Sequence, residues 1–371
     1  MTILIALLCF GAVYLLQSMI YRRFWYRNLS VELNFQSCEC MEGERILLKE
    51  VVRNAKRLPL PVLHVKFRTS RSFLFDSEEN SAVTDYYYRN DIYAIGGRQI
   101  ITRLLPFVCS KRGCYEINEA SLLSTDLFLT LILFCPVPTD TLLYVYPKRV
   151  DMSSFEIPYR SITGEFITNN RLFPDPFEFR GIRNYQPFDR MRSINWKSSA
   201  KNNTLLVNTY YQTASRNVKI FLNLDRQLMI TEDEIIEYAI RIAGTLANRF
   251  IADQVPLSMV TNARDVFADT PVCLGTGSGT RHITAIDRGL ARIDLKKKPS
   301  DFLCLLKDEF SEAISRNTYY IIISNNRKPE LINYYARLKE QKAACSFIIP
   351  EKRSGGPVSL MQDMFLWEVP E

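Results

Sequence analysis

An uncharged apolar segment at the N-terminus constrains this chain more than any other feature. The 18 residues from Ile3 to Ile20 read ILIALLCFGAVYLLQSMI and include no Asp, Glu, Lys or Arg. As a helix they would be about 27 Å long, close to the thickness of a bilayer core. Arg22, Arg23 and Arg27 follow, and short basic flanks stay on the cytoplasmic side. We therefore predict a single-pass transmembrane anchor at residues 1–21 that leaves the soluble domains cytoplasmic at the cell membrane.

A cleaved signal peptide is the alternative interpretation of this segment. The chain has no basic region before the segment and no A-x-A-like cleavage site after it, which favours a retained anchor. A second apolar run, Leu127 to Val137, is too short to span a bilayer and is predicted to be a buried strand.

Charge and residue counts exclude several classes of function. The 371 residues carry a formal net charge of +7, and the excess is concentrated after the anchor and between residues 180 and 201. A nucleic-acid-binding domain spreads its basic residues over a whole face, so no nucleic-acid partner is expected. With 2 histidines and 9 cysteines that form no C-x-x-C pair, the chain has no multi-histidine or zinc-ribbon site. No cofactor is predicted.

Two periodicities divide the rest of the chain. Residues 29–150 contain many short alternating runs separated by turns, which predicts a β-sandwich domain. Residues 218–371 alternate short apolar runs with helical stretches, which predicts an α/β domain with a mainly parallel sheet. Ligands of such sheets bind beyond the carboxyl ends of the strands. The fold class is therefore α+β multidomain with an N-terminal transmembrane helix.

The linking segment 151–217 holds the most distinctive motif of the chain. It contains Arg183-Asn-Tyr185-Gln-Pro187-Phe-Asp189-Arg-Met-Arg192-Ser-Ile194-Asn-Trp196-Lys-Ser-Ser199-Ala200-Lys201. This resembles the signature R-x-Y-x-P-G-D-x-x-R-x-I-x-W-x-x-S-A-R of the bacterial family called domain of unknown function 58. Phe188 replaces the glycine of the signature, and Lys201 replaces the final arginine.

The resemblance implies a membrane anchor, a β-sandwich, the signature segment and a von Willebrand factor A-like domain. Members of this family often have two membrane helices, whereas this chain shows one. Their genes commonly lie beside a gene for a MoxR-type AAA+ ATPase, so the resemblance implies that ATPase as a partner. The family has no established biochemical activity.

The signature segment has two interpretations. As a structural clasp, Asp189 would pair with arginines while Tyr185 and Trp196 pack between the two soluble domains. As a binding surface, its basic residues would meet an anionic ligand or an acidic protein, because guanidinium groups pair bidentately with carboxylate or phosphate. The candidate binding residues are Arg180, Arg183, Tyr185, Asp189, Arg192, Trp196, Lys197 and Lys201.

Two weaker candidate sites lie in the α/β domain. A von Willebrand factor A domain binds Mg²⁺ through D-x-S-x-S, and this chain has Asp225-Arg-Gln-Leu-Met, so only Asp225 matches and no metal site is predicted. The loop Gly275–Gly279 lacks the G-K-[ST] ending of a P-loop and is predicted to be a flexible connection.

We therefore predict a membrane-tethered, non-enzymatic adaptor or assembly factor with two partners, the lipid bilayer and a MoxR-type AAA+ ATPase. The first alternative is an enzyme or binding protein for a phosphorylated or carboxylated ligand at the basic cluster. The second is a Mg²⁺-dependent ligand-binding domain centred on Asp225.

Overall fold

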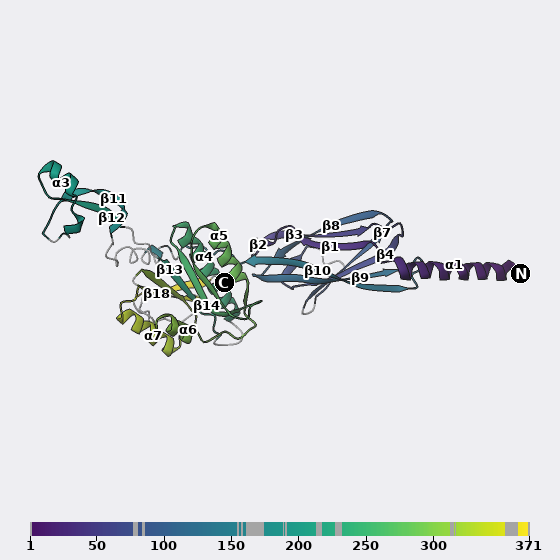
Figure 1. The fold of residues 1–371 in the computed structure, drawn as a ribbon. Helices are drawn as coiled ribbons and strands as arrows, with labels where there is room; N and C mark the ends of the chain where they lie inside the picture. The colour runs from purple at the N-terminus through teal and green to yellow at the C-terminus, as the bar shows by residue number, and fades with distance from the viewer. Residues whose placement is uncertain are drawn as a thin grey trace. The chain divides into compact units, whose positions relative to one another are not determined.

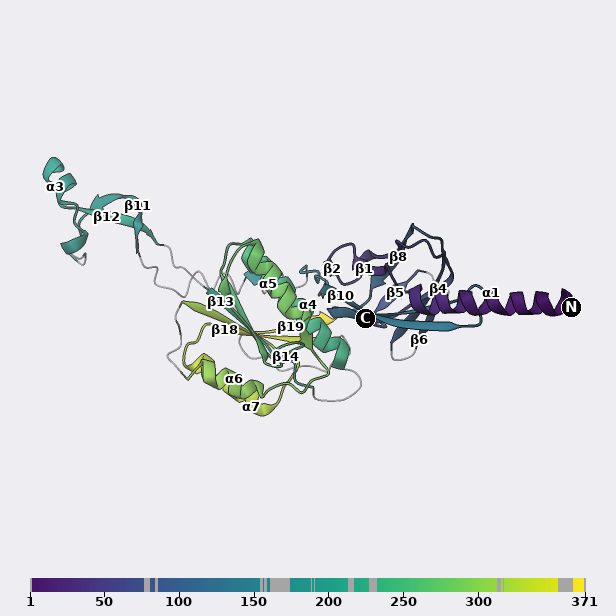
Figure 2. The same cartoon turned by 45° about the vertical axis from the view of Figure 1, so that its right-hand side comes forward.

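The computed structural model forms two compact units (Figures 1 and 2). Unit 1 is Met1–Lys148 with Asp287–Asp294, and unit 2 is Arg149–Ile286 with Leu295–Glu371. The structure describes residues 2–76, 81–83, 86–153, 156, 159–160, 174–187, 189, 191–212, 217–226, 232–311, 315, 317–352 and 363–369.

Unit 1 begins with the predicted apolar helix, α1 (Thr2–Phe24). Its segment Ile3–Phe24 has a mean hydropathy of 2.3 and is long and apolar enough to cross a membrane. The end of α1 belongs to the core of unit 1, because Tyr21 is 1% exposed and the following Trp25 is 7% exposed. The Tyr21 hydroxyl donates to the Pro59 carbonyl at 2.8 Å. The helix therefore continues directly into the folded domain.

The body of unit 1 is a β-sandwich, as the alternating pattern predicted. Within the described residues, one sheet has the order β1-β3-β8-β5 and the other β2-β10-β9-β4-β7-β6. All pairs are antiparallel except β2 with β10. The strands are β1 (Leu29–Phe35), β2 (Glu39–Met41), β3 (Arg45–Asn54), β4 (Leu60–Thr69), β5 (Phe73–Phe75), β6 (Ser81–Val83), β7 (Tyr87–Ile95), β8 (Gln99–Cys109), β9 (Gly113–Thr125) and β10 (Ile132–Tyr146).

Alternate side chains from both sheets fill the space between them and form one apolar core. On β3, for example, Ile46, Leu48 and Val52 point inward and are at most 7% exposed. Phe73, Phe75 and Phe107 add an aromatic cluster. The ring centroid of Phe107 lies 4.6 Å from that of Phe73 and 5.2 Å from that of Phe75. Burial of this apolar face is the main force that holds the sandwich together.

One prediction for unit 1 is wrong. Leu127–Val137 was expected to be a buried strand, but the stretch before Ile132 is a turn between β9 and β10. Leu129 is 62% exposed, and Ile132 and Phe134 on β10 are 78% and 59% exposed. Hydrophobicity did not predict burial here because the side chains that point outward from this segment are apolar, like those that point inward.

Unit 2 contains a separate hairpin and a larger sheet. The hairpin pairs β11 (Pro174–Asn184) with β12 (Leu206–Gln212), and its tip carries the 3-10 helix η1 (Met191–Ser193) and α3 (Trp196–Asn202). Figure 1 shows α3 at the end of the hairpin. The hairpin forms a two-stranded sheet of its own among the described residues.

The larger sheet of unit 2 has the order β15-β14-β13-β17-β18-β19. Strands β14, β13, β17, β18 and β19 are parallel, and β15 is antiparallel at one edge. When the strands of this sheet alone are numbered along the chain, the order is 3-2-1-4-5-6, the order of doubly wound folds, in which helices cover both faces. The strands are β13 (Asn217–Leu222), β14 (Leu257–Asp265), β15 (Pro271–Gly277), β17 (Thr318–Ile323), β18 (Cys345–Lys352) and β19 (Met364–Val369). The short β16 (Ile293–Asp294) falls within unit 1.

Both views show α4 and α5 on one face of this sheet and α6 and α7 on the other. The second face packs through Phe302 and Leu306 of α6 and Tyr335 of α7 onto Phe221 and Phe347 of the strands. The helices are α4 (Glu232–Ala252), α5 (Thr280–Ala291), α6 (Phe302–Glu309) and α7 (Pro329–Glu340).

Two details of unit 2 differ from the sequence-based expectation. The loop Gly275–Gly279 is not wholly a connection, since Gly275 and Gly277 belong to the edge strand β15. Glycine suits this edge because a Cβ on Gly277 would lie 2.6 Å from Nδ1 of His282. The chain also continues after β18 into a further parallel strand, β19, which the sequence analysis did not predict.

Candidate functional site

The signature motif forms the tip of the β11–β12 hairpin. The backbone N–H of Tyr185 donates to the Leu205 carbonyl, and the N–H of Asn195 donates to the Leu206 carbonyl, both at 2.8 Å. These bonds continue the strand pairing into the tip. The two hydrogen bonds therefore close the base of the loop between Tyr185 and Leu205.

Two polar side chains fix α3 on this loop. The Asn195 side chain caps the helix, accepting from the Ser198 N–H at 3.0 Å and donating to the Asn208 side chain at 2.8 Å. Ser199 is 7% exposed, and its hydroxyl donates to the Asn195 carbonyl at 2.7 Å and accepts from the Leu206 N–H at 2.9 Å. A capping bond of this kind stabilises a short helix that would not persist alone.

The aspartate of the motif is paired with the first arginine. Both guanidinium nitrogens of Arg183 donate to Asp189, at 2.6 and 2.7 Å, and the Gln186 N–H donates to the same carboxylate at 2.8 Å. The Arg183 hydrogen bond is the main cause of a lowered pKa for Asp189. This agrees with the expected pairing of Asp189 with an arginine. It also means that Arg183 is already engaged and is not free to bind an external anion.

The remaining described cations of the tip are exposed. Arg192, Lys197 and Lys201 form no ion pair or hydrogen bond with a described residue. They add three positive charges to a tip whose only described carboxylate, Asp189, is neutralised by Arg183. The side chain of Arg180 lies outside the described residues.

Large apolar side chains are exposed beside these cations. Trp196 and Met191 are each 61% exposed, Leu205 is 47% exposed and Ile182 is 44% exposed. Trp196 therefore does not pack within the hairpin itself. Tyr185, in contrast, is half-buried. Exposed Trp and Met beside Arg and Lys are typical of the centre and rim of a protein interface.

The second candidate, Asp225, lies where strands β13, β14 and β17 end. Its Oδ1 accepts from the Asn262 side-chain amide at 2.7 Å. The same amide donates to Asn223 Oδ1 at 3.2 Å, and the Asn223 amide donates to the Ser324 hydroxyl at 3.0 Å. Burial raises the pKa of Asp225. The polar groups therefore satisfy one another at the position where this sheet order places a ligand crevice.

This arrangement does not suit a divalent cation. Amide N–H groups point at the only carboxylate, whereas Mg²⁺ needs several converging oxygen ligands. Among the described residues no group of three or more His, Cys, Asp or Glu could hold a metal ion.

The two histidines are engaged in the structure rather than poised for catalysis. A ring nitrogen of His64 lies 3.0 Å from the Asn90 side-chain oxygen, and Nε2 of His282 lies 2.7 Å from the Leu257 carbonyl. Neither contact joins a histidine to a nucleophilic serine or cysteine.

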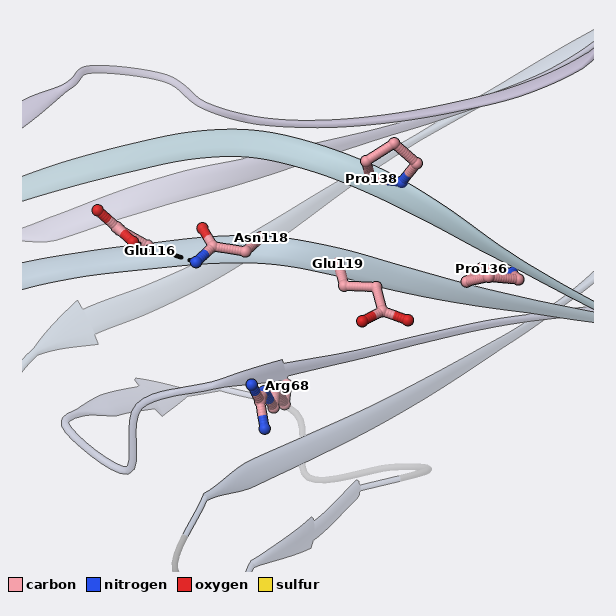
Figure 3. A pocket seen from close by; sticks show the side chains of 6 residues that line it. All are labelled: Arg68, Glu116, Asn118, Glu119, Pro136 and Pro138. Atoms are coloured by element: carbon pink, nitrogen blue, oxygen red, sulfur yellow. Dashed lines mark hydrogen bonds between the residues drawn. The ribbon is translucent and has the colours of Figure 1, made fainter.

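Two hollows lie on the outer face of the larger sheet of unit 1. The first, of about 440 Å³, is lined by Arg68, Glu116, Asn118, Glu119, Pro136 and Pro138. Figure 3 shows the Glu119 carboxylate pointing toward the strand that carries Arg68. The second, of about 790 Å³, shares Arg68 and Glu119 and extends to Tyr88 and Phe134. Both hollows bring charged side chains of neighbouring strands together on this face.

The sandwich encloses a buried ionic network that was not predicted from the sequence. Asp91 on β7 accepts from Arg89 at 2.7 Å and from Arg103 of β8 at 2.9 Å. Glu50 on β3 lies directly opposite Arg103 in the strand register and is 0% exposed. The available signal was a charged residue at an inward position of an alternating strand, such as Glu50 between Leu48 and Val52.

Burial and the neighbouring Asp91 carboxylate raise the pKa of Glu50 to about 8, while Tyr93 and Arg103 oppose the shift. Tyr93 and Asp91 are close enough to influence this pKa, yet neither makes a hydrogen bond of normal geometry to a Glu50 oxygen. The carboxyl group is therefore mainly protonated at neutral pH.

No family model matches the sequence, and no curated protein matches it. Solved structures share a limited likeness. A non-cellulosomal cohesin from Archaeoglobus fulgidus matches at 12% identity over 34% of this chain and 96% of its own, with a TM-score of 0.20. A CARDB domain from Pyrococcus furiosus matches at 10% identity over 31% of this chain and 90% of its own, also with a TM-score of 0.20. These scores are too low to support a function.

Proposed function

We propose that this protein is a membrane-tethered, non-enzymatic adaptor whose hairpin tip docks onto an acidic face of a partner protein. The tip consists of residues 182–205 and is called the docking tip below. The observation that carries the proposal is the exposure of Trp196 and Met191 on a hydrogen-bonded tip beside Arg192, Lys197 and Lys201. An apolar anchor ringed by unpaired cations fits a protein surface with a hydrophobic pocket and acidic rim.

The tether is supported by the way α1 joins unit 1. Tyr21 and Trp25 are buried in the sandwich core, so cleavage close to residue 20 would remove or expose part of that core. This favours a retained anchor over a cleaved signal peptide. Arg22, Arg23 and Arg27 favour a cytoplasmic location for the soluble units.

The partner we propose is a MoxR-type AAA+ ATPase, on the basis of the signature motif that resembles domain of unknown function 58. The doubly wound order of unit 2 and its edge strand β15 support a von Willebrand factor A-like assignment. The amide network around Asp225 favours a metal-independent form of that domain.

The test is co-purification of the full chain, solubilised in detergent, with a MoxR-type AAA+ ATPase produced in the same cells. Trp196→Ala combined with Lys197→Glu should abolish the complex and leave thermal unfolding unchanged, because both side chains are exposed. Lys307→Glu, which reverses an exposed cation on α6, is the matched control and should bind normally. Binding that survives the Trp196 variant would refute the docking tip. A fall in thermal stability of that variant would favour the clasp interpretation.

A further inference from the structure

The turn between β9 and β10 presents an apolar surface that the soluble fold does not use. Leu127, Phe128 and Leu129 are 55%, 43% and 62% exposed, and Ile132 and Phe134 are 78% and 59% exposed. The sequence from Leu127 to Pro138 contains no charged residue. A contiguous apolar patch of this kind marks an interaction surface.

This turn lies against α1. The Phe128 ring is 5.9 Å from that of Phe10 and 6.0 Å from that of Tyr14, centroid to centroid. The Tyr14 hydroxyl donates to Thr130 Oγ1 at 3.2 Å, and Gln17 Nε2 donates to Asp126 Oδ2 at 2.7 Å. Both the helix and the turn belong to unit 1.

The contacts gather the polar side chains of α1 on one face. Tyr14, Gln17 and Tyr21 are three to four residues apart, which places them on the same side of a helix. Gln17 is 9% exposed, while Leu15, Leu16 and Met19 around it are 62 to 68% exposed. An unpaired amide in hydrocarbon costs several kcal/mol, on the order of the penalty for any unsatisfied polar group there. The turn supplies a partner for the N–H group of the Gln17 amide if this part of α1 is inside a bilayer.

The position of the contacts along α1 determines the depth of the turn. Phe10 lies ten residues before Ile20, at the end of the predicted span, or about 15 Å along the helix axis. If the membrane began beyond the turn, only Ile3 to Cys9 would remain free, which is roughly 10 Å of helix against a hydrocarbon core of about 30 Å. A spanning α1 therefore carries the turn into the bilayer with it.

Several polar groups of the turn are hydrogen-bonded within it. Asp126 is 0% exposed and, besides Gln17, accepts from the Thr130 N–H at 2.7 Å, the Thr130 hydroxyl at 2.8 Å and the Leu131 N–H at 3.1 Å. The Leu129 N–H donates to the Asp126 carbonyl at 3.2 Å. Each of these bonds removes an unsatisfied polar group that the turn would otherwise carry into the bilayer.

We propose that the β9–β10 turn, residues 126–132, is a second membrane-inserted element that contacts lipid acyl chains beside α1. This inference rests on the proposed membrane tether and deepens it. The membrane anchor then consists of α1 together with the β9–β10 turn. Two points of insertion would fix the orientation of the β-sandwich at the bilayer, whereas a single helix would let it rotate.

The experiment places a tryptophan reporter in the turn of the full chain, reconstituted in nanodiscs made with acyl-chain-brominated phosphatidylcholine. Bromine quenches tryptophan only on contact, and the emission of Trp25, Trp196 and Trp367 in the unaltered protein is subtracted. The emission added by Phe128→Trp should be weaker in brominated lipid than in ordinary lipid. Ile132→Trp is a second reporter at a more exposed position and should lose emission as well.

Leu74→Trp is the matched control, because Leu74 on β5 is 56% exposed. Leu74 lies far from α1 along the sandwich. Its partner Val108 is nine residues along β8 from Gln99. Gln99 lies opposite Asn54, which pairs with Leu29 at the start of β1, shortly after α1 ends. Nine strand residues span roughly 30 Å. The added emission of Leu74→Trp should therefore be the same in brominated and in ordinary lipid.

A further reporter separates failure of this inference from failure of the tether. Leu8→Trp lies on an exposed face of α1. If Leu8→Trp is quenched and both turn reporters are not, α1 is in the bilayer and the inserted turn is refuted. If none of the three is quenched, the tether itself is refuted, and the inserted turn with it. Turn reporters that are protected from quenching only in nanodiscs holding two copies would assign the surface to a second copy of this chain and overturn the proposal.

Discussion

Replacing Glu50 with glutamine should stabilise unit 1, and the gain should grow with pH. Glu50 is 0% exposed on β3, opposite Arg103 and near Asp91 and Tyr93. Burial raises its pKa from an ordinary value of 4.5 to about 8, so the folded chain favours the protonated, uncharged form. Glutamine has nearly the same shape and is uncharged at every pH. The variant therefore keeps the favoured state without the cost of ionisation.

The magnitude follows from proton linkage. An acid whose pKa is raised on folding contributes stability that is fully present below its unfolded pKa and is lost as pH rises through its folded pKa. Each tenfold change in proton affinity is worth about 1.4 kcal/mol. For a pKa that moves from 4.5 to about 8, the expected advantage of Glu50→Gln is about 1 kcal/mol at pH 5 and about 4 kcal/mol at pH 8.

Amide hydrogen exchange of the full chain in detergent measures this locally. Peptides from β3 and β8 report the opening of unit 1, and peptides from β13 and β17 in unit 2 serve as an internal reference. Opening free energies at pH 5 and pH 8 are compared after correction for the intrinsic exchange rates. Glu32→Gln, on an exposed face of β1, is the matched control and should change neither value.

The opposite result would refute this reasoning. If Glu50→Gln destabilises β3 and β8 at pH 8, Glu50 is an ionised partner of Arg103, because breaking a buried ion pair is costly. Equal effects at pH 5 and pH 8 would also contradict a raised pKa, since a packing change alone does not depend on pH.

Three further outcomes are expected. Mg²⁺ should leave the calorimetric unfolding of unit 2 unchanged, because amide N–H groups already face Asp225; a shift that disappears in Asp225→Ala would contradict this. Ser199→Ala should raise hydrogen exchange in β12 by an amount worth about 1–3 kcal/mol, because it leaves the Leu206 N–H without its partner; unchanged exchange would show that the bond is unimportant. An impermeant maleimide should label the exposed Cys304 only in permeabilised spheroplasts, whereas labelling in intact ones would place unit 2 outside.

Local patterns in the sequence predicted most kinds of element and their order, although they missed β19 and the strand character of Gly275 and Gly277. The uncharged run before Arg22 predicted α1, and the period-two pattern predicted the sandwich, because both depend on residues close together in the chain. Local hydrophobicity gave the wrong prediction at Leu127–Val137, because it indicated burial and several of these side chains are exposed. A bilayer and a protein core select the same residues, so composition does not separate them.

The sequence also showed which residue types make up the candidate site. It did not show which of these side chains are exposed and able to bind a partner. Arg183 and Asp189 are both in the motif, yet only the folded tip shows that they neutralise each other and leave Arg192, Lys197 and Lys201 as the exposed cations. Backbone bonds between the two hairpin strands create that arrangement. They join residues whose distance in space cannot be read from their spacing in the chain.

By itself, then, the sequence determined an apolar N-terminal helix, a β-rich part, an alternating α/β part and a basic motif between them. Only the tertiary structure decided that Asp225 faces amides, that Glu50 lies opposite Arg103 inside the sandwich, and that Gln17 reaches Asp126 across 109 residues of chain. The physical reason is that element type follows from local periodicity, whereas the charge state and exposure of a side chain depend on strand register and on partners distant in sequence.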